Sequence, residues 1–434
     1  MIGAETLRFS GAVEDLSGAD RGALFSRAAN EDASIVQRAA AIVEDVRARG
    51  DAALRELARA LDGASLDALE VPRATVRRAL DSASPALRRA LERSARNIAT
   101  VHRAFMPTAM EVESEPGVVI GRRPDPLQRV GVYAPGGRAA YPSSVLMGAI
   151  PARAAGVAEV ILCSPPAPDG MPSRAVLAAA ALAEVDRVFA IGGAGAIAAM
   201  AYGTESVPRV DRIVGPGNAY VAAAKLLVVR QVAIDSPAGP SELIVIADES
   251  ADASVVATEM VAQAEHDPLA CVIAVAVGEA AASRIERALV DATVRADRAE
   301  IVREALAGQG GVLRVSCVSE AIAFSNRYAP EHLLLCVSDA EAALRSVRNA
   351  GTVFLGERAS VAFGDYMTGA NHVLPTGGLA RSYSGLSPLD FVRWTTYQRV
   401  SGVAAASLAN DVGTFADAES LPGHAAAARQ WSAR

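Results

Sequence analysis

The chain has 434 residues, of which 51% are hydrophobic and 21% charged, values typical of a folded protein rather than a disordered one. A chain of this length is expected to form more than one domain. Its formal net charge of −7 argues against nucleic acid as a partner, because nucleic-acid-binding proteins present a basic face. We attribute the excess of arginine over lysine to genomic bias.

The four cysteines do not form a Cys-x-x-Cys pair, and each stands in an apolar, strand-like run: Cys163, Cys271, Cys317 and Cys336. We expect all four to be buried as small apolar side chains in a reduced compartment. The N-terminus lacks the basic start and apolar core of a signal peptide. No apolar run approaches the ~18 residues of a membrane span. The sequence therefore predicts a cytoplasmic protein that does not enter a membrane.

Residues from about 30 to 105 show a charged, helical pattern. Apolar side chains recur at helical spacing over residues 35–46, 53–61 and 87–98. We interpret this region as scaffold, and His102 as an ordinary surface or cap histidine.

Strands and helices alternate beyond residue 124. A strand ending at Val132 runs into a Gly/Pro-rich loop, and that loop opens a helix near Ser144. Strands at 159–163 and 187–190 flank a helix at 175–182. Such alternation indicates a parallel sheet. Loops that follow its strands are favoured ligand sites, because backbone N–H groups and helix N-termini converge there.

The next turn satisfies the pattern G-x-G-x-x-A at Gly193, Gly195 and Ala198. A dinucleotide fingerprint normally lies in the first βαβ unit, with an acidic residue ~20 positions further on. Here an earlier strand precedes the pattern, and Glu205 and Asp211 are too near. A standard fingerprint, a close-packed turn and a different nucleotide-contacting turn all remain open.

A strand–turn–helix junction at 212–221 places Asn218 where its side chain can cap the helix or reach a ligand. A tight loop at 234–242 then leads into a second α/β set. Its strands are expected at 243–246, 271–277, 312–315, 333–337 and 351–355.

Gln263 and His266 end the apolar helix that starts at Ala253. Pro268 places His266 in the last turn of that helix, and a spacing of three puts both side chains on one face. Burying two such groups is costly unless a metal, a substrate or another protein group satisfies them.

Glu331 and His332 directly precede a core strand, so they lie either at an exposed strand edge or in a cleft. A long irregular stretch after residue 355 contains Asp365, and segments of this kind are usually functional or tied down elsewhere. After residue 386 the pattern turns helical. Four of the five histidines lie in the C-terminal part of the chain, where they could serve metal binding, proton transfer or imidazole recognition: His266, His332, His372 and His424.

Several long motifs, in order along nearly the whole chain, resemble the histidinol dehydrogenase family. The motifs lie at 132–137, 140–144, 213–220, 238–242, 263–269, 328–333 and 371–376. The resemblance implies oxidation of L-histidinol to L-histidine through L-histidinaldehyde, with two NAD and one Zn²⁺ per subunit.

Carried over by position, the resemblance implies a catalytic pair, with His332 taking a proton and Glu331 activating water. It implies four zinc ligands: Gln263, His266, Asp365 and His424. Their N and O donors, without thiolate, also suit manganese or cobalt. The implied substrate contacts are these four ligands together with His332, Ser241, His372 and Glu419.

Tyr133 and Asn218 match the family's NAD contacts, but Gly195 stands where the family usually carries Gln. The missing side-chain hydrogen bond is worth roughly 1 kcal/mol. We therefore expect weaker NAD binding than in relatives that carry the Gln, and tighter binding when Gln is restored.

The implied fold is α/β, with two incomplete Rossmann-like domains built on parallel sheets and small helical segments at both ends. Glu419 and His424 are expected to reach the site of the partner subunit, so the resemblance implies a homodimer with shared active sites. The expected parts are an N-terminal arm at 1–28, a zinc, substrate and catalytic domain at 29–132 and 243–385, an inserted NAD domain at 133–242, and a helical tail at 386–434.

Three other functions remain open from the sequence. One is a dehydrogenase on the same scaffold that oxidises another alcohol, such as a sulfonated propanediol. The second is a zinc hydrolase that uses the same ligands, with Glu331 and water. The third is a non-catalytic binding protein. Glu419 and His372 suit an amino-acid-like substrate and favour histidinol.

Overall fold

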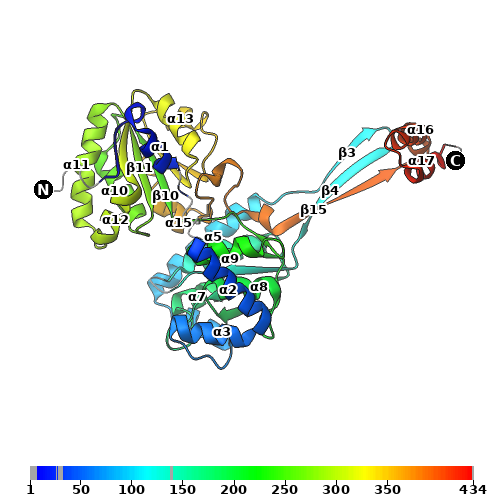
Figure 1. Ribbon diagram of the computed structural model, residues 1–434, viewed down its shortest axis with the longest axis horizontal. Helices are drawn as coiled ribbons and strands as arrows, with labels where there is room; N and C mark the ends of the chain where they lie inside the picture. The colour runs from blue at the N-terminus through cyan, green and yellow to red at the C-terminus, as the bar shows by residue number, and fades with distance from the viewer. Residues whose placement is uncertain (1–6, 26, 28–32, 137–139, 433–434) are drawn as a thin grey trace. The chain divides into compact units, whose positions relative to one another are not determined.

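The computed structural model describes residues 7–25, 27, 33–136 and 140–432. The chain divides into two compact units. One contains residues 1–105 and 128–391, and the other contains residues 106–127 and 392–434. Each unit is described by itself (Figure 1).

The first unit contains two parallel sheets, and the first of these has six strands. Their order across the sheet is β1 (Phe9–Ala12), β12 (Gly310–Val315), β11 (Cys271–Val277), β10 (Glu242–Ala247), β13 (His332–Cys336) and β14 (Thr352–Leu355). Every residue of β10 and β13 is buried, because helices cover both faces of the sheet, and such strands read as continuous apolar runs.

Alternate residues of β10 point to opposite faces of this sheet, as the period of two requires. Leu243 and Val245 pack in the core with α10 (Ala253–Ala264), α11 (Glu279–Arg295) and α12 (Ala299–Gln309). Ile244 and Ile246 pack in the opposite core, which contains side chains from α1 (Gly18–Phe25), α13 (Val318–Tyr328) and α14 (Ala340–Leu344).

The second sheet has the order β2 (Glu70–Val71), β7 (Arg187–Ala190), β6 (Glu159–Ser164), β5 (Arg129–Tyr133), β8 (Arg212–Val214) and β9 (Ala233–Ile234). All its pairs are parallel except β2 with β7. One core contains side chains from the helices α2 (Ala33–Arg49), α3 (Asp51–Leu57), α8 (Gly193–Tyr202) and α9 (Ala219–Val228).

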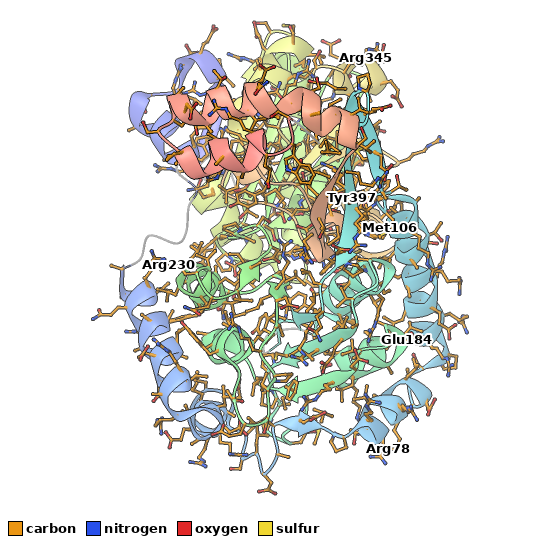
Figure 2. All side chains as sticks on the ribbon, turned by 90° about the vertical axis from the view of Figure 1, so that its right-hand side faces the viewer. Arg78, Met106, Glu184, Arg230, Arg345 and Tyr397 are labelled. Carbon is orange, nitrogen blue, oxygen red and sulfur yellow. The ribbon has the colours of Figure 1, made fainter. Side chains whose placement is uncertain are left out.

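Four further helices of this part are α4 (Arg73–Asp81), α5 (Pro85–Ala104), α6 (Pro142–Ala154) and α7 (Arg174–Leu182). Helix α4 packs on α7, and α5 packs on α6. Arg78 on α4 and Glu184, just after α7, are exposed (Figure 2). Short elements complete the unit: η2 (Val13–Asp15), η4 (Ala58–Asp62), α15 (Val361–Tyr366), η5 (Leu379–Arg381) and η6 (Pro388–Phe391).

The second unit is a three-stranded antiparallel sheet followed by two helices. The strand order is β15 (Val392–Val400), β4 (Val118–Pro126), β3 (Met110–Glu115), and the helices are α16 (Gly402–Ala418) and α17 (Pro422–Arg429). The expectation of a wholly helical segment after residue 386 is therefore wrong over β15. That strand is rich in β-branched and aromatic residues, and it pairs with β4, far away in sequence.

The α/β fold class with parallel sheets is confirmed, but several segments belong to other parts of the fold than expected. The expected N-terminal arm contributes β1, which pairs with β12 at the edge of the first sheet. Residues 33–81, expected with the catalytic domain, belong with the second sheet, because α2 and α3 share its core and β2 pairs with β7. These associations are long-range contacts that helical periodicity does not specify.

Two expectations for single residues are wrong. His102 is 2% exposed and so is not a surface histidine, and Cys317, expected to be buried, is exposed. The other three cysteines are buried. In the part of the chain that the structure describes, no helix is long and apolar enough to span a membrane.

Candidate active site

A cluster of buried polar residues lies at the amino end of two central strands of the first sheet. Glu242 is the first residue of β10 and His332 the first residue of β13, where His332 pairs in register with Leu243. Glu242, Glu331 and His332 are 1%, 7% and 4% exposed. The predicted Glu331–His332 pair therefore lies inside the protein rather than at an exposed strand edge.

The two ring nitrogens of His332 have different surroundings. Nδ1 lies 3.0 Å from the carbonyl oxygen of Glu242, and because a carbonyl only accepts, Nδ1 carries the hydrogen. Nε2 is buried and has no hydrogen-bond partner among the described residues. The nearest carboxylate oxygen, Asp365 Oδ1, is 3.6 Å away. Nε2 is thus the ring atom free to accept a proton or meet a ligand.

Asp365, in helix α15, lies among three histidines. His372 Nδ1–H donates to the Asp365 carbonyl oxygen at 2.9 Å, and His372 Nε2 lies 3.5 Å from Ser144 Oγ in α6. Burial by itself raises the pKa of the Asp365 carboxyl, but the neighbouring histidines, His332 first, outweigh burial and lower that pKa. Asp365 thus lies beside two of the predicted histidines, His332 and His372.

The catalytic pair itself has shifted pKa values. Burial raises the pKa of Glu331, although the charge of His332 opposes the shift. Burial alone lowers the pKa of His332, but the charges of Glu331 and Asp365 raise it well above its usual range. Both pKa values are raised, and perturbed pKa values of this kind are typical of functional sites.

Helix α10 ends at Ala264, so His266 lies two residues beyond it and not in its last turn. The His266 N–H still donates to the Gln263 carbonyl at 3.4 Å, which continues the turn. Gln263 is 3% exposed and His266 is exposed.

One hydrogen bond ties the helices that carry these residues. The Val361 N–H, at the start of α15, donates to Glu259 Oε2 in α10 at 3.1 Å. Gln263 and Asp365 each lie four residues further along their own helix. Residues four apart share a helix face. The bond between Val361 and Glu259 therefore joins the face of α15 that carries Asp365 to the face of α10 that carries Gln263.

Sequence reasoning missed two residues that order the site, Arg27 and Glu242. Arg27 Nε and Nη2 donate to the two Glu242 carboxylate oxygens at 2.9 and 3.3 Å. The guanidinium lies 3.4 Å from the centre of the Tyr328 ring, and the Gly377 N–H donates to Glu242 Oε1 at 2.8 Å. Glu242 is the last residue of the family motif at 238–242, whereas no motif or periodic pattern singles out Arg27.

The predicted NAD contacts lie at the carboxyl edge of the second sheet. In this sheet β6 lies on one side of β5 and β8 lies on the other. The strand order therefore reverses between β5 and β8, and such a switch point is where parallel sheets bind ligands. Tyr133 ends β5, and its Oη accepts from the Gly193 N–H at 3.0 Å. Burial raises the pKa of Tyr133 to about 12. Asn218 Oδ1 caps α9 through the Tyr220 and Val221 N–H groups, at 3.1 and 3.2 Å.

Gly195 lies in the first turn of α8, two residues after Gly193. It is buried in α8, and a Cβ there would lie 3.0 Å from Leu57 Cδ1 and 3.3 Å from Leu54 Cδ2. A side chain at 195 would thus start against α3, which gives a physical reason to revise the expected link between Gly195 and NAD affinity.

Of the remaining predicted residues, Ser241 is the chain neighbour of Glu242, and Glu419 and His424 belong to the second unit. Ser241 immediately precedes β10, and its carbonyl accepts from the Cys271 N–H at 2.9 Å. Glu419 follows α16 and His424 lies in α17, both exposed in the second unit. Among the described residues, no three His, Cys, Asp or Glu side chains are grouped to hold a metal by themselves.

The donor chemistry nonetheless fits a borderline metal such as zinc. Gln263 and Asp365 offer oxygen, and His266 offers nitrogen. The buried Nε2 of His332, which has no hydrogen-bond partner among the described residues, is a group that a ligand would satisfy. The NAD loops also fit their cofactor, because two helix N-termini, those of α6 and α9, follow them.

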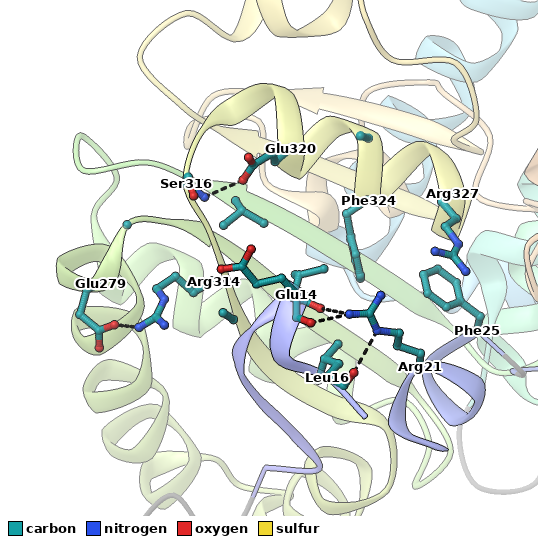
Figure 3. Close-up of a pocket in the computed structure, with 15 residues that line it drawn as sticks. Glu14, Leu16, Arg21, Phe25, Glu279, Arg314, Ser316, Glu320, Phe324 and Arg327 are labelled. Carbon is teal, nitrogen blue, oxygen red and sulfur yellow. Dashed lines mark hydrogen bonds and ion pairs between the residues drawn. The ribbon is translucent and has the colours of Figure 1, made fainter. Parts of the chain in front are cut away.

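A separate cavity of about 680 Å³ lies at the carboxyl edge of the first sheet, opposite His332. Several of its charged side chains have partners (Figure 3): Arg21 donates to the carbonyls of Leu16 and Glu14, Arg314 pairs with Glu279, and Glu320 accepts from the Ser316 N–H. None of the predicted site residues lines it.

Comparison with known proteins covers almost the whole chain. The family model for histidinol dehydrogenase matches residues 25–431. A histidinol dehydrogenase from Methanosarcina mazei is 45% identical over 414 residues, 95% of each chain. One from Halobacterium salinarum is 48% identical over 416 residues, 96% of this chain and 97% of the relative.

A solved structure agrees with the sequence relatives. The crystal structure of histidinol dehydrogenase from Elizabethkingia anophelis has a TM-score of 0.93 and 33% identity, and the match covers 98% of both chains. The chain therefore belongs to the histidinol dehydrogenase family of NAD-dependent oxidoreductases.

Proposed function

We propose that the protein oxidises L-histidinol to L-histidine through L-histidinaldehyde. Each histidinol consumes two NAD, and each subunit binds one Zn²⁺. The observation that carries this proposal is the buried His332 Nε2, which has no hydrogen-bond partner in the part of the chain that the structure describes. It lies 3.6 Å from Asp365 Oδ1 and beside the buried Glu331 carboxylate. A proton acceptor, a candidate metal ligand and a second acid–base group thus meet at one edge of the first sheet.

His332 serves as the proton acceptor in the first oxidation. In the neutral ring the Glu242 carbonyl holds the hydrogen on Nδ1, so Nε2 receives the alcohol proton as hydride leaves the carbinol carbon. The neighbouring Glu331 and Asp365 carboxylates, which raise the pKa of His332, stabilise the imidazolium that forms. Removing two electrons as hydride and one proton converts the alcohol to the aldehyde.

Glu331 serves in the second oxidation. Its Oε2 accepts from the Glu242 N–H at 2.8 Å, and burial raises its pKa, which makes it a stronger base than an exposed carboxylate. It takes a proton from the water that adds to the aldehyde carbon. The hydrate then loses a second hydride and becomes the carboxylic acid, so one water and two hydride acceptors balance the reaction.

Gln263, His266 and Asp365 are the residues of this unit proposed to hold zinc, with His424 of the second unit as the fourth ligand. Zinc, when bound, supplies a Lewis-acidic centre that holds the imidazole and amino nitrogens of the substrate. NAD, when bound at the loops that contain Tyr133 and Asn218, supplies the hydride acceptor.

Ser241, His372 and Glu419 are proposed to bind substrate, Glu419 by attracting its ammonium group. Glu419 and His424 are exposed in the second unit, as expected if they complete the site of a partner subunit. The proposed assembly is therefore a cytoplasmic homodimer with shared active sites.

NADH absorbance with L-histidinol as substrate tests the proposal. We expect two NADH per histidinol consumed, loss of turnover with a chelator, and recovery on adding Zn²⁺. A sulfonated propanediol serves as the competing substrate, and its preferred turnover would replace histidinol in the proposal. Product formation without NADH would indicate a hydrolase instead.

A further inference from the structure

Lys225 is the one lysine among the 42 basic residues of the chain. It lies in helix α9, where it is 4% exposed. Lysine is rarely buried to this extent unless its ammonium is paired. In a chain that uses arginine at every other basic position, the single lysine marks a place where the smaller ammonium is required.

The Lys225 ammonium holds the turn that follows β8. Nζ donates to the Gly215 carbonyl and to Asp235 Oδ1, both at 2.5 Å. The other oxygen of Asp235 accepts from the Gly215 N–H at 2.7 Å. Both polar backbone groups of Gly215 are therefore fixed by one buried ion pair, whose side chains are 5% and 2% exposed.

Gly215 is the point where the two loops at the switch point touch. Its φ is +118°, and a Cβ there would lie within 2.1 Å of the Tyr133 carbonyl oxygen. No other residue type could sit so close in that conformation. Fixing Gly215 therefore fixes the distance between the loop after β5 and the turn that leads to Asn218.

Arginine could not replace Lys225 without moving this turn. The ammonium presents three donors from a single atom at the end of a slim stem, whereas a guanidinium is planar and larger. A buried site that closes to 2.5 Å around one nitrogen has no room for the additional atoms, since protein interiors are close-packed.

We propose that Lys225 is a positioning residue for the dinucleotide: with Asp235 it holds the Gly215–Asn218 turn against Tyr133 in the geometry that binds NAD. The inference rests on the proposed NAD-dependent oxidation. Lys225 does not touch the substrate cluster around His332, so its replacement acts on cofactor binding and leaves the chemistry of the bound complex nearly intact.

The test compares Lys225→Arg with the double variant Lys225→Met/Asp235→Asn, which removes both buried charges and keeps an acceptor for the Gly215 N–H. Arg230→Lys is the matched control, because Arg230 is exposed just after the same helix (Figure 2). Calorimetric titration gives the Kd for NAD⁺. Initial rates give kcat and the KM values for NAD⁺ and L-histidinol.

We expect both Lys225 variants to raise the Kd and KM for NAD⁺ at least tenfold, while kcat and the KM for histidinol change less than threefold. The control should match the wild type. Unchanged NAD⁺ affinity in variants that melt near the wild-type temperature overturns the inference. Parallel loss of all parameters indicates a merely structural role and also overturns it.

A wild type that binds no NAD⁺ refutes the proposed function itself, so the two failures are distinguishable. Because the chain has one lysine, its accessibility provides an independent readout. Acylation of Lys225, located by peptide mass, should be very slow in the native protein and should slow further with NAD⁺ bound. Rapid labelling in the folded wild type would contradict a buried, fixed ammonium.

Discussion

The backbone N–H groups of Glu242 and Glu331 each donate to the other residue's carboxylate: the Glu242 N–H donates to Glu331 Oε2 at 2.8 Å, and the Glu331 N–H donates to Glu242 Oε2 at 3.3 Å. The Glu242 carbonyl also accepts from His332. One residue of β10 thus aligns both members of the proposed catalytic pair, and Arg27 balances its buried charge.

Glu242→Gln should lower the free energy of unfolding by about 3–5 kcal/mol, because it leaves the Arg27 charge buried without a partner. It should also lower kcat at least tenfold. Urea denaturation and NADH kinetics measure the two effects. Glu92→Gln breaks an exposed ion pair with Arg88 on α5 and, as the control, should cost less than about 1 kcal/mol.

The double variant Arg27→Met/Glu242→Gln separates the effect of Glu242 on folding stability from its effect on the positions of Glu331 and His332. It removes the unpaired charge and should recover part of the lost stability, while kcat stays low because a neutral amide oxygen accepts from the Glu331 and Gly377 N–H groups more weakly than the carboxylate does. Recovery of kcat together with stability would show that Glu242 acts on the fold alone.

His332→Asn should lower kcat by about 10²–10⁴-fold, the usual contribution of a general acid–base group. Zinc content measured by atomic emission should stay close to that of the wild type, because His332 is not among the proposed ligands. As a comparison, Gln263→Ala should lose zinc. A His332 variant that loses metal and keeps turnover would reverse these roles.

Gly195→Gln should lower the free energy of unfolding by about 1–3 kcal/mol, the usual cost of overpacking, because the atoms beyond its Cβ must also be placed where the Cβ already contacts Leu57 and Leu54. Gly195→Ala is the control and should be nearly neutral, since the gain in helix propensity of about 1 kcal/mol offsets the tighter contact. Calorimetry should show no tighter binding of NAD⁺ to the Gln variant. Tighter binding would restore the expectation drawn from the family sequence.

His102 should make stability depend on pH. Burial lowers its pKa to about 4, below its value in the unfolded chain, so between pH 6.5 and 4 the unfolded state binds more protons. Acidification over that range should therefore remove up to about 3 kcal/mol. At pH above 6.5 the ring is neutral in both states and contributes no pH dependence.

Urea denaturation of the wild type and of His102→Leu at pH 7.5 and 4.5 measures this effect. Asp62, whose pKa burial raises to about 6, acts in the opposite direction, but it is present in both proteins and cancels in the comparison. The Leu variant should lose less stability on acidification. Equal losses would show that His102 is protonated in the folded state.

Local sequence predicted the elements that carry the site more accurately than their associations. The strands at 187–190 and 271–277 match β7 and β11, because short apolar runs between turn residues specify buried strands. The predicted helix end at His266 was two residues too late. Ends depend on capping contacts, which pattern alone does not fix.

The sequence by itself determined the α/β class, the order of the elements and, through its motifs, the family. Only the tertiary structure decided that residues 33–81 join the second sheet, that His102 is buried with no hydrogen-bond partner among the described residues, and that Arg27 reaches Glu242 across 215 residues. The reason is physical: periodicity records which face of an element is apolar, whereas burial and ion pairing depend on which distant element covers that face.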